Sequence, residues 1–204
     1  MTTLSSPIDL IKKSCQIFFK KENLKIFVLI YLPLVLFFIP SLFKFEDSWQ
    51  AWILGGMSFA QIFISAIVTS ATIFAIGHIV SGKKISVKEA FGSAWKIYWK
   101  FLILSVLLSL IIGFGLILLI IPGIIFGVWF AFSTFIFVEE KTGIKEAFVK
   151  SKQLVKGKFW KVFGRLIVFG LFGFLAGIIP LASTIFGALF VLPAYLLYRE
   201  LVKE

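Results

Sequence analysis

The chain has 204 residues, of which 60% are hydrophobic and 15% are charged, and its formal net charge at pH 7 is +11. Soluble domains are about half apolar and about one quarter charged, so this composition excludes a water-soluble globular protein and indicates a polytopic, all-α membrane protein. The basic residues lie beside long apolar runs, so we expect them to face anionic lipid headgroups and not nucleic acid.

Six apolar segments are expected to cross the membrane. The first is Leu24–Phe43 and the second is Ala51–Val80. The uncharged run Phe101–Val138 would form a helix about 57 Å long, whereas a hydrocarbon core is about 30 Å thick, so one ordinary span cannot use it. We divide this run at its Ile-Pro pair and a later run in the same way, which gives the remaining spans: Phe101–Ile121, Pro122–Val138, Phe159–Ile179 and Leu181–Tyr198.

Lysine and arginine residues fall almost entirely on one side of this arrangement. If the chain turns at Ile121–Pro122 and again at Pro180, all of them except Lys44 lie on the same side. Positive charge in short loops marks the cytoplasmic side of a membrane protein. The sequence therefore predicts six spans arranged as three hairpins, with the N- and C-termini both in the cytoplasm.

Each predicted hairpin follows a basic amphipathic segment, which we expect to be an interfacial helix. Aligned at Ile8, Val87 and Ile144, the three segments repeat apolar or small residues at offsets of three, seven and ten, the spacing of one helical face. Ser86 and Glu89 form a capping-box pattern at one start. The prediction is one membrane domain, 1–204, with pseudo-repeats at about 7–80, 86–138 and 143–200; the alternative is that Ile-Pro pairs arise by chance in an Ile-rich chain. The expected repeat turns contain Pro40, Pro122, Gly123 and Pro180.

The stretch from Ile120 to Leu166 carries a recognisable pattern. An I-P-G turn, a short aromatic span, acidic residues, an E-A-hydrophobic-x-x-S helix and a G-x-F/W start follow one another, carried by Pro122, Gly123, Glu139, Glu146, Ala147, Ser151, Gly157 and Trp160. Over roughly residues 85–200 the chain resembles a bacterial integral membrane family: the membrane domain attached to some glycerophosphoryl diester phosphodiesterases, and the YciC-type membrane proteins. The resemblance implies a bacterial cytoplasmic-membrane architecture. It does not extend to the soluble phosphodiesterase domain, so it implies no hydrolase activity.

A catalytic constellation is not expected from these residues. Phosphodiester hydrolysis needs clustered carboxylates and histidines, whereas this chain has one histidine, His78. Glu139 and Glu140 are adjacent at the end of a span and beside Lys141, where we expect a solvated stop with a structural salt link. The single Cys15 excludes an internal disulfide, and the sequence has no zinc or phosphate-loop pattern. We therefore expect no cofactor, no metal ion and no enzyme activity.

A polar stripe runs along the second predicted span. Its members are Ser58, Gln61, Ser65, Thr69 and Thr72, spaced three or four residues apart and so on one helical face. Such a stripe either forms the wall of a substrate path or makes hydrogen bonds to a neighbouring helix, worth around 1 kcal/mol or less per contact. We favour the hydrogen-bonding interpretation and keep the path as the alternative.

Lysines and aromatic residues gather in the cytoplasmic segments. Aromatic rings anchor helices at headgroup depth, and each lysine near an anionic leaflet contributes on the order of 1 kcal/mol to lipid binding. We hypothesise a non-enzymatic protein that organises or senses anionic lipids or envelope components, with a membrane protein or a second copy as a further partner. The alternatives are a permease or export component, and third a membrane-embedded lipid enzyme. The headgroup candidates are Lys12, Lys13, Lys20, Lys21, Lys96, Lys100, Lys150, Lys152, Lys156, Lys158, Trp95, Trp99 and Trp160.

Overall fold

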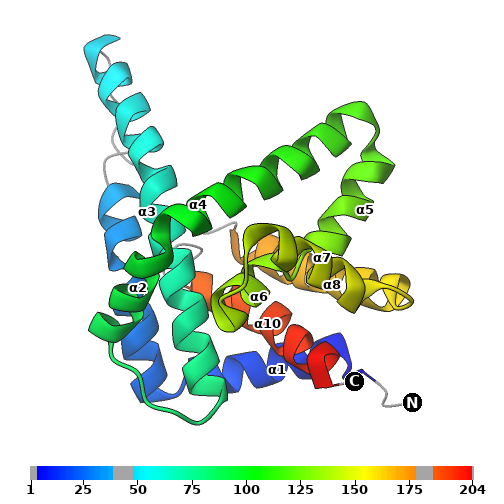
Figure 1. Cartoon of the computed structure of the whole chain (residues 1–204). Coiled ribbons are helices and arrows are strands. Elements are labelled where there is room, and N and C mark those ends of the chain that lie inside the picture. Colours follow the sequence, from blue (N-terminus) through cyan, green and yellow to red (C-terminus); the bar gives the residue numbers. More distant parts are fainter. Residues whose placement is uncertain (1–3, 39–47, 178–185, 204) are drawn as a thin grey trace.

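The computed structural model describes residues 4–38, 48–177 and 186–203, and every regular element in them is an α-helix. This confirms the all-α fold class. The helices are α1 (Pro7–Phe18), α2 (Lys21–Phe38), α3 (Ser48–Val80), α4 (Val87–Leu118), α5 (Ile120–Phe130), α6 (Ser133–Glu140), α7 (Ile144–Val155), α8 (Phe159–Gly177) and α10 (Gly187–Lys203). Figure 1 shows α2 and α3 as one antiparallel pair and α4 and α5 as another, with α1, α6, α7, α8 and α10 gathered near the two chain ends.

Three described stretches are long and apolar enough to cross a membrane: Gly55–Val80, Val87–Leu118 and Ile120–Glu140. They correspond to the second, third and fourth predicted spans. The predicted spans Leu24–Phe43, Phe159–Ile179 and Leu181–Tyr198 each run into residues outside the described part, and the predicted turn residues Pro40 and Pro180 lie there as well.

The long apolar run reverses direction one residue before the Ile-Ile-Pro-Gly sequence. Leu119 is extended, with φ −161° and ψ 138°, and it separates α4 from α5. Pro122 lies in the first turn of α5, where its missing N–H is harmless. Gly115 and Gly123 face each other across the turn, so closely that a Cβ on Gly115 would lie 2.8 Å from the Cα of Gly123. Two glycines therefore allow α4 and α5 to touch through their backbones.

The predicted capping box at the start of α4 is confirmed. Ser86 Oγ accepts a hydrogen bond from the Glu89 N–H at 3.2 Å, and the Glu89 carboxylate accepts one from the Ser86 N–H at 2.8 Å. The first, second and third amphipathic segments start at Pro7, Val87 and Ile144. Counted from these starts, the equivalent of Val87 and Ile144 is Pro7 and not the predicted Ile8. The predicted face of α1 is likewise out by one residue at Ile11 and Cys15, which are half-buried, whereas its member Phe18 is buried as expected.

Counting from the start of each helix places the same positions of the three segments on the buried faces. Ile8 is 59% exposed, whereas the buried residues of α1 include Leu10 and Ser14. Their equivalents, counted from the helix starts, are the buried pairs Ala90–Ala94 in α4 and Ala147–Ser151 in α7. The apolar spacing alone could not settle this register because Leu10 and Ile11 are adjacent and both apolar.

The second amphipathic segment is not a separate interfacial helix. A boundary was predicted between Lys100 and Phe101, but α4 continues through it without a break. The third segment does end, because Lys156 leaves the helical region (φ −57°, ψ 128°) and Gly157 has φ +79°. The second has neither glycine nor proline between Gly92 and Gly113, so nothing stops its helix.

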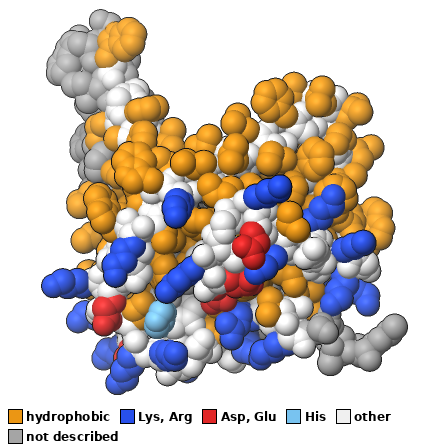
Figure 2. All heavy atoms as spheres, in the orientation of Figure 1, with side chains coloured by type: hydrophobic (Ala, Val, Ile, Leu, Met, Phe, Trp, Pro, Cys, Tyr) orange, Lys and Arg blue, Asp and Glu red, His pale blue; other side chains and the backbone are white. Residues whose placement is uncertain are grey.

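Apolar and charged side chains separate along the molecule. Figure 2 shows hydrophobic side chains over the projecting α3 and over the α4–α5 pair, while Lys, Arg, Asp and Glu gather over the lower part. The apolar face of α4 is largely uncovered, with Val106, Leu110 and Phe114 among its exposed residues. The two chain ends meet at the charged end, where the Ser5 N–H donates to the Glu200 carboxylate at 3.1 Å and Arg165 donates to the Ser5 carbonyl at 3.0 Å. Both ends are therefore on the same side of the apolar helices.

Candidate functional site

A groove lined by lysine and aromatic side chains lies between α5, α7 and α8. Its volume is about 620 Å³, and its lining includes Trp129, Lys152, Lys156 and Trp160. Lys152 Nζ lies 4.2 Å from the centre of the Trp129 ring, a cation–π contact, and Trp160 is 77% exposed. None of the residues that line it is acidic. We call this site the basic–aromatic groove.

Two local features hold the groove together. The helix of the fourth predicted span breaks at Ala131–Phe132, and the buried Ser151 of α7 bridges the break. Its Oγ accepts from the Phe132 N–H at 3.2 Å and donates to the Trp129 carbonyl at 2.8 Å, so α7 is fixed against α5. The left-handed Gly157 then turns the chain into α8. Lys152 and Trp160 are thereby brought to one groove from separate helices.

The other predicted headgroup residues are not gathered into this groove. Lys12, Lys13, Lys21, Lys96 and Lys100 are exposed on α1, α2 and α4, and Lys158 lies on the α7–α8 link. Trp95 and Trp99 are each 69% exposed on α4. Lys20 lines a separate cleft beside the loop that follows α3.

Lys150 has a structural partner and is less available to a lipid than predicted. Its Nζ lies 2.7 Å from a Glu140 oxygen and 3.0 Å from a Glu146 oxygen. Hydrogen bonds to these carboxylates raise the pKa of Lys150, so it stays charged and joins α7 to the end of α6. The sequence predicts a structural salt link at the Glu139–Glu140 pair, and the structure shows one from Lys150 to Glu140.

The predicted polar stripe divides between two environments. Ser65 and Thr69 line a groove of about 580 Å³ between α3 and α4, opposite Ser105 and Ser109. Thr72 is instead buried and donates to the Val68 carbonyl at 2.8 Å. Ser58 and Gln61 are not in this groove. The stripe therefore supplies part of one hydroxyl-lined groove and no continuous path along α3.

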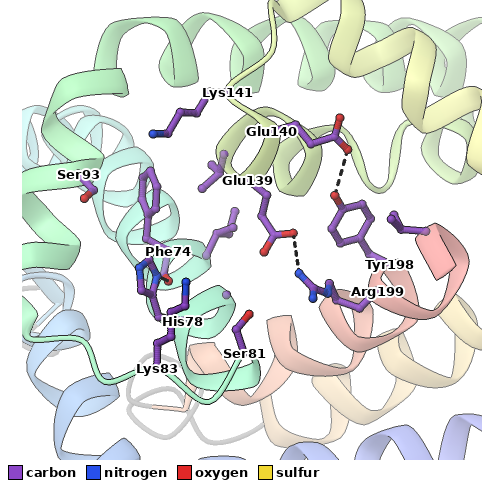
Figure 3. A pocket seen from close by; sticks show the side chains of 14 residues that line it. Phe74, His78, Ser81, Lys83, Ser93, Glu139, Glu140, Lys141, Tyr198 and Arg199 are labelled. Atoms are coloured by element: carbon purple, nitrogen blue, oxygen red, sulfur yellow. Dashed lines mark hydrogen bonds and ion pairs between the residues drawn. The ribbon is translucent and has the colours of Figure 1, made fainter.

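A polar cavity of about 670 Å³ lies where the ends of α3, α6 and α10 meet. Figure 3 shows Glu139 between His78 on one side and Arg199 on the other. Glu139 accepts a hydrogen bond from the Tyr195 hydroxyl, and Arg199 Nη1 lies 3.5 Å from its second oxygen. Glu140 accepts from the Tyr198 hydroxyl at 3.3 Å. The two adjacent carboxylates thus connect α6 to α10.

Gly77 allows the Glu139 carboxylate to approach α3. A Cβ at position 77 would lie 2.9 Å from Glu139 Oε1 and 3.3 Å from the Tyr195 hydroxyl oxygen. One turn earlier, the Phe74 carbonyl oxygen lies 2.9 Å from His78 Nδ1 and can accept a hydrogen bond from it. His78 therefore shares one cavity with Glu139 and Glu140, although no sequence pattern connects the histidine with the two carboxylates.

Residues 50–193 match the model of an uncharacterised protein family, UPF0259. The chain belongs to this family. It is similar to a UPF0259 membrane protein of Pectobacterium carotovorum subsp. carotovorum (strain PC1), with 30% identity over 100 residues, or 49% of this chain and 40% of the relative. The match thus spans less than half the length of that relative. No solved structure matches the chain.

Membership of UPF0259 confirms the expectation of an uncharacterised bacterial membrane family. The relative's name and the apolar helices place this UPF0259 chain in a membrane. Neither comparison supports the finer resemblance to phosphodiesterase membrane domains or to YciC-type proteins.

Sequence reasoning missed the polar cavity of this UPF0259 chain because its parts are distant in sequence. One signal was available: Tyr198 and Arg199 follow Tyr195 by three and four residues, the separations that bring side chains to one face of a helix. A tyrosine–arginine face predicts an acidic partner, and Glu139–Glu140 is the acidic pair at the end of an apolar span. The sequence does not say which helix supplies that partner.

Proposed function

We propose that this protein is a non-enzymatic, multi-pass protein of the bacterial cytoplasmic membrane that binds anionic lipid headgroups in the basic–aromatic groove, and so organises or senses lipid. The carrying observation is the convergence of Lys152 and Lys156 with Trp129 and Trp160 in one groove without a carboxylate. Lysine ammonium groups attract a phosphate, and tryptophan rings prefer headgroup depth.

The proposed topology has six spans in three hairpins with both termini in the cytoplasm. The contact of Ser5 with Glu200 supports it, since the described chain ends lie together. So does the reversal between α4 and α5 at Leu119. In this topology the basic–aromatic groove lies at the cytoplasmic interface, where anionic lipids attract positively charged segments.

The test compares two double variants that remove the same charge. Lys152→Gln with Lys156→Gln empties the groove of ammonium groups, whereas Lys12→Gln with Lys13→Gln removes two exposed lysines of α1 that do not line it. Two lysines at about 1 kcal/mol each give an expected loss of about 30-fold in affinity. Lys150 is left intact because its substitution would break ion pairs with Glu140 and Glu146.

The measurement is lipid binding by native mass spectrometry of the full chain in an uncharged detergent, with phosphatidylglycerol and phosphatidylcholine, at low and high salt. We expect the groove variant to lose its preference for phosphatidylglycerol and the α1 variant to keep it. Equal losses in the two variants would show a diffuse charge effect and would contradict a site in the groove.

The hydroxyl-lined groove between α3 and α4 favours a second candidate function, transport of a polar solute. Ser65 and Thr69 face Ser105 and Ser109 there, within two membrane-crossing candidates. In a Cys15→Ser background, Ser65→Cys should react with a water-soluble maleimide, whereas Thr72→Cys, at a buried position, should not. Complete protection of both cysteines would rule out a water-filled path.

A further inference from the structure

A second cleft differs from the basic–aromatic groove by containing an acid as well as lysines. It has a volume of about 350 Å³ and lies between the α1–α2 link and the loop after α3. Lys20 and Glu22 line it from one side, and Lys83 and Lys84 line it from the other. We call this site the zwitterionic cleft.

Among the residues that the structure describes, the charged groups of the zwitterionic cleft form no ion pair with one another or with other side chains. The ion pairs of Lys150 and Arg199 do not involve Glu22, Lys20 or Lys84. Glu22 is also exposed. A carboxylate and three ammonium groups are therefore available to a ligand that carries charges of both signs.

The backbone on both sides of the cleft is fixed. The Asn23 side chain donates to the Ile17 carbonyl at 2.8 Å and closes the α1–α2 link. On the other side, Gly82 has φ +74°, and the Lys83 N–H donates to the His78 carbonyl at 2.9 Å. The backbone that carries the lysines and the glutamate is thus held in place, although their exposed side chains are not, and this lowers the part of the entropy cost of binding that comes from ordering the loops.

The remaining lining is mostly apolar, and part of it comes from the end of the membrane-crossing candidate α3. Ile79 is in the last turn of α3, and Ile26 is in the second turn of α2. Ile85 is 8% exposed. Charged groups of both signs together with isoleucines match a phospholipid at the interface, where the headgroup is wet and the acyl chains are not.

We propose that the zwitterionic cleft binds a phosphoethanolamine-type group, with the phosphate contacting Lys20, Lys83 and Lys84 and the primary ammonium contacting Glu22. The site does not depend on the basic–aromatic groove, whose lining contains no acid to hold an ammonium. A quaternary ammonium would bind less well because it has no N–H to donate to Glu22.

The test asks whether removing the charge of Glu22 changes which lipid headgroup the chain prefers. The full chain, in an uncharged detergent, is titrated with phosphatidylethanolamine, phosphatidylglycerol and phosphatidylcholine, and lipid adducts are counted by native mass spectrometry. We expect Glu22→Gln to weaken phosphatidylethanolamine binding about tenfold, the size of one charge-assisted hydrogen bond, and to leave phosphatidylglycerol binding equal or stronger.

The matched control is Asp9→Asn, which removes the acid in the first turn of α1 as Glu22→Gln does in α2. It should change neither affinity. Glu22→Asp keeps the charge and should keep the preference for ethanolamine, so a loss caused by misfolding of Glu22→Gln would be recognised. Lys152→Gln with Lys156→Gln should also keep it, which separates this site from the basic–aromatic groove.

Free O-phosphoethanolamine distinguishes the two sources of this group. Competition by the free compound that depends on Glu22 assigns the ligand to the cytoplasm, and binding of the lipid alone assigns it to the bilayer. If Glu22→Gln changed the binding of phosphatidylethanolamine and phosphatidylglycerol equally, or changed neither, the proposal would be overturned.

Discussion

The backbone contact between α4 and α5 can be tested with two glycines that lie in the same helix. Gly113 and Gly115 are both in α4, but an added Cβ at Gly113 would meet nothing within 4 Å. At Gly115 it would lie 2.8 Å from the Gly123 Cα and 3.0 Å from the Gly123 nitrogen. Backbone atoms cannot rotate away as a side chain can, so Gly115→Ala must push α5 outward by about 1 Å to restore ordinary contact distances.

The expected difference in unfolding free energy between Gly113→Ala and Gly115→Ala is what remains after their common contribution cancels. Both gain the helix propensity of alanine over glycine, about 1 kcal/mol, so this contribution cancels in a comparison. The remainder is the cost of overpacking, about 1–3 kcal/mol, carried by Gly115→Ala alone. Gly123→Ala should be at least as damaging, because its Cβ would lie 2.6 Å from the Leu116 nitrogen.

The assay is reversible unfolding in mixed micelles with increasing dodecyl sulfate, monitored by far-ultraviolet circular dichroism. We expect Gly113→Ala to unfold at the same or a higher denaturant fraction than the unchanged chain, and Gly115→Ala at a lower one. Equal stability of the two variants would show that α4 and α5 do not touch at this pair, and the hairpin geometry would then be wrong.

Three further substitutions test contacts between distant segments. Ser151→Ala removes both hydrogen bonds across the α5–α6 break and should lower the free energy of unfolding by about 1–3 kcal/mol. Ser105→Ala, which loses a bond only to its own helix, should cost less in the same denaturant titration. Gly77→Ala displaces only the ends of the Glu139 and Tyr195 side chains and gains about 1 kcal/mol of helix propensity, so it should change the melting temperature little, in contrast to Gly115→Ala. Tyr195→Phe leaves the Glu139 carboxylate without its hydroxyl donor and should lower the melting temperature, whereas an unchanged value would show the bond to be unimportant.

Features encoded by neighbouring residues were predictable from the sequence. The hydropathy of Ala51–Val80 and of Phe101–Val138 sufficed to predict apolar membrane-crossing helices there. The Ser86–Glu89 capping box was also predictable, because both residues of the motif lie within one turn. Such signals depend on the order of residues and not on what packs against them. The six-span topology and the threefold repeat extend beyond the described residues and stay predictions.

Features that depend on packing could not be predicted in this way. The break at Ala131–Phe132 has no proline or glycine at it, and it is stabilised by Ser151, which lies on another helix. The meeting of Glu139 with Tyr195 likewise requires α6 and α10 to be adjacent. The one-residue error at Ile8 arose because two neighbouring apolar residues fit the same helical spacing.

Most of the lysines line neither the basic–aromatic groove nor the zwitterionic cleft. Both clefts are built where an amphipathic helix ends and the next helix begins, at Lys20 and at Lys156. The equivalent point in the second segment, at Lys100, is inside the continuous α4, and neither cleft includes it. A chain that changes direction at a link sets its lysines against a second segment, whereas lysines on an uninterrupted helix face outward. The interruption of the helix, more than the number of lysines, is therefore the property that gathers lysines into a cleft.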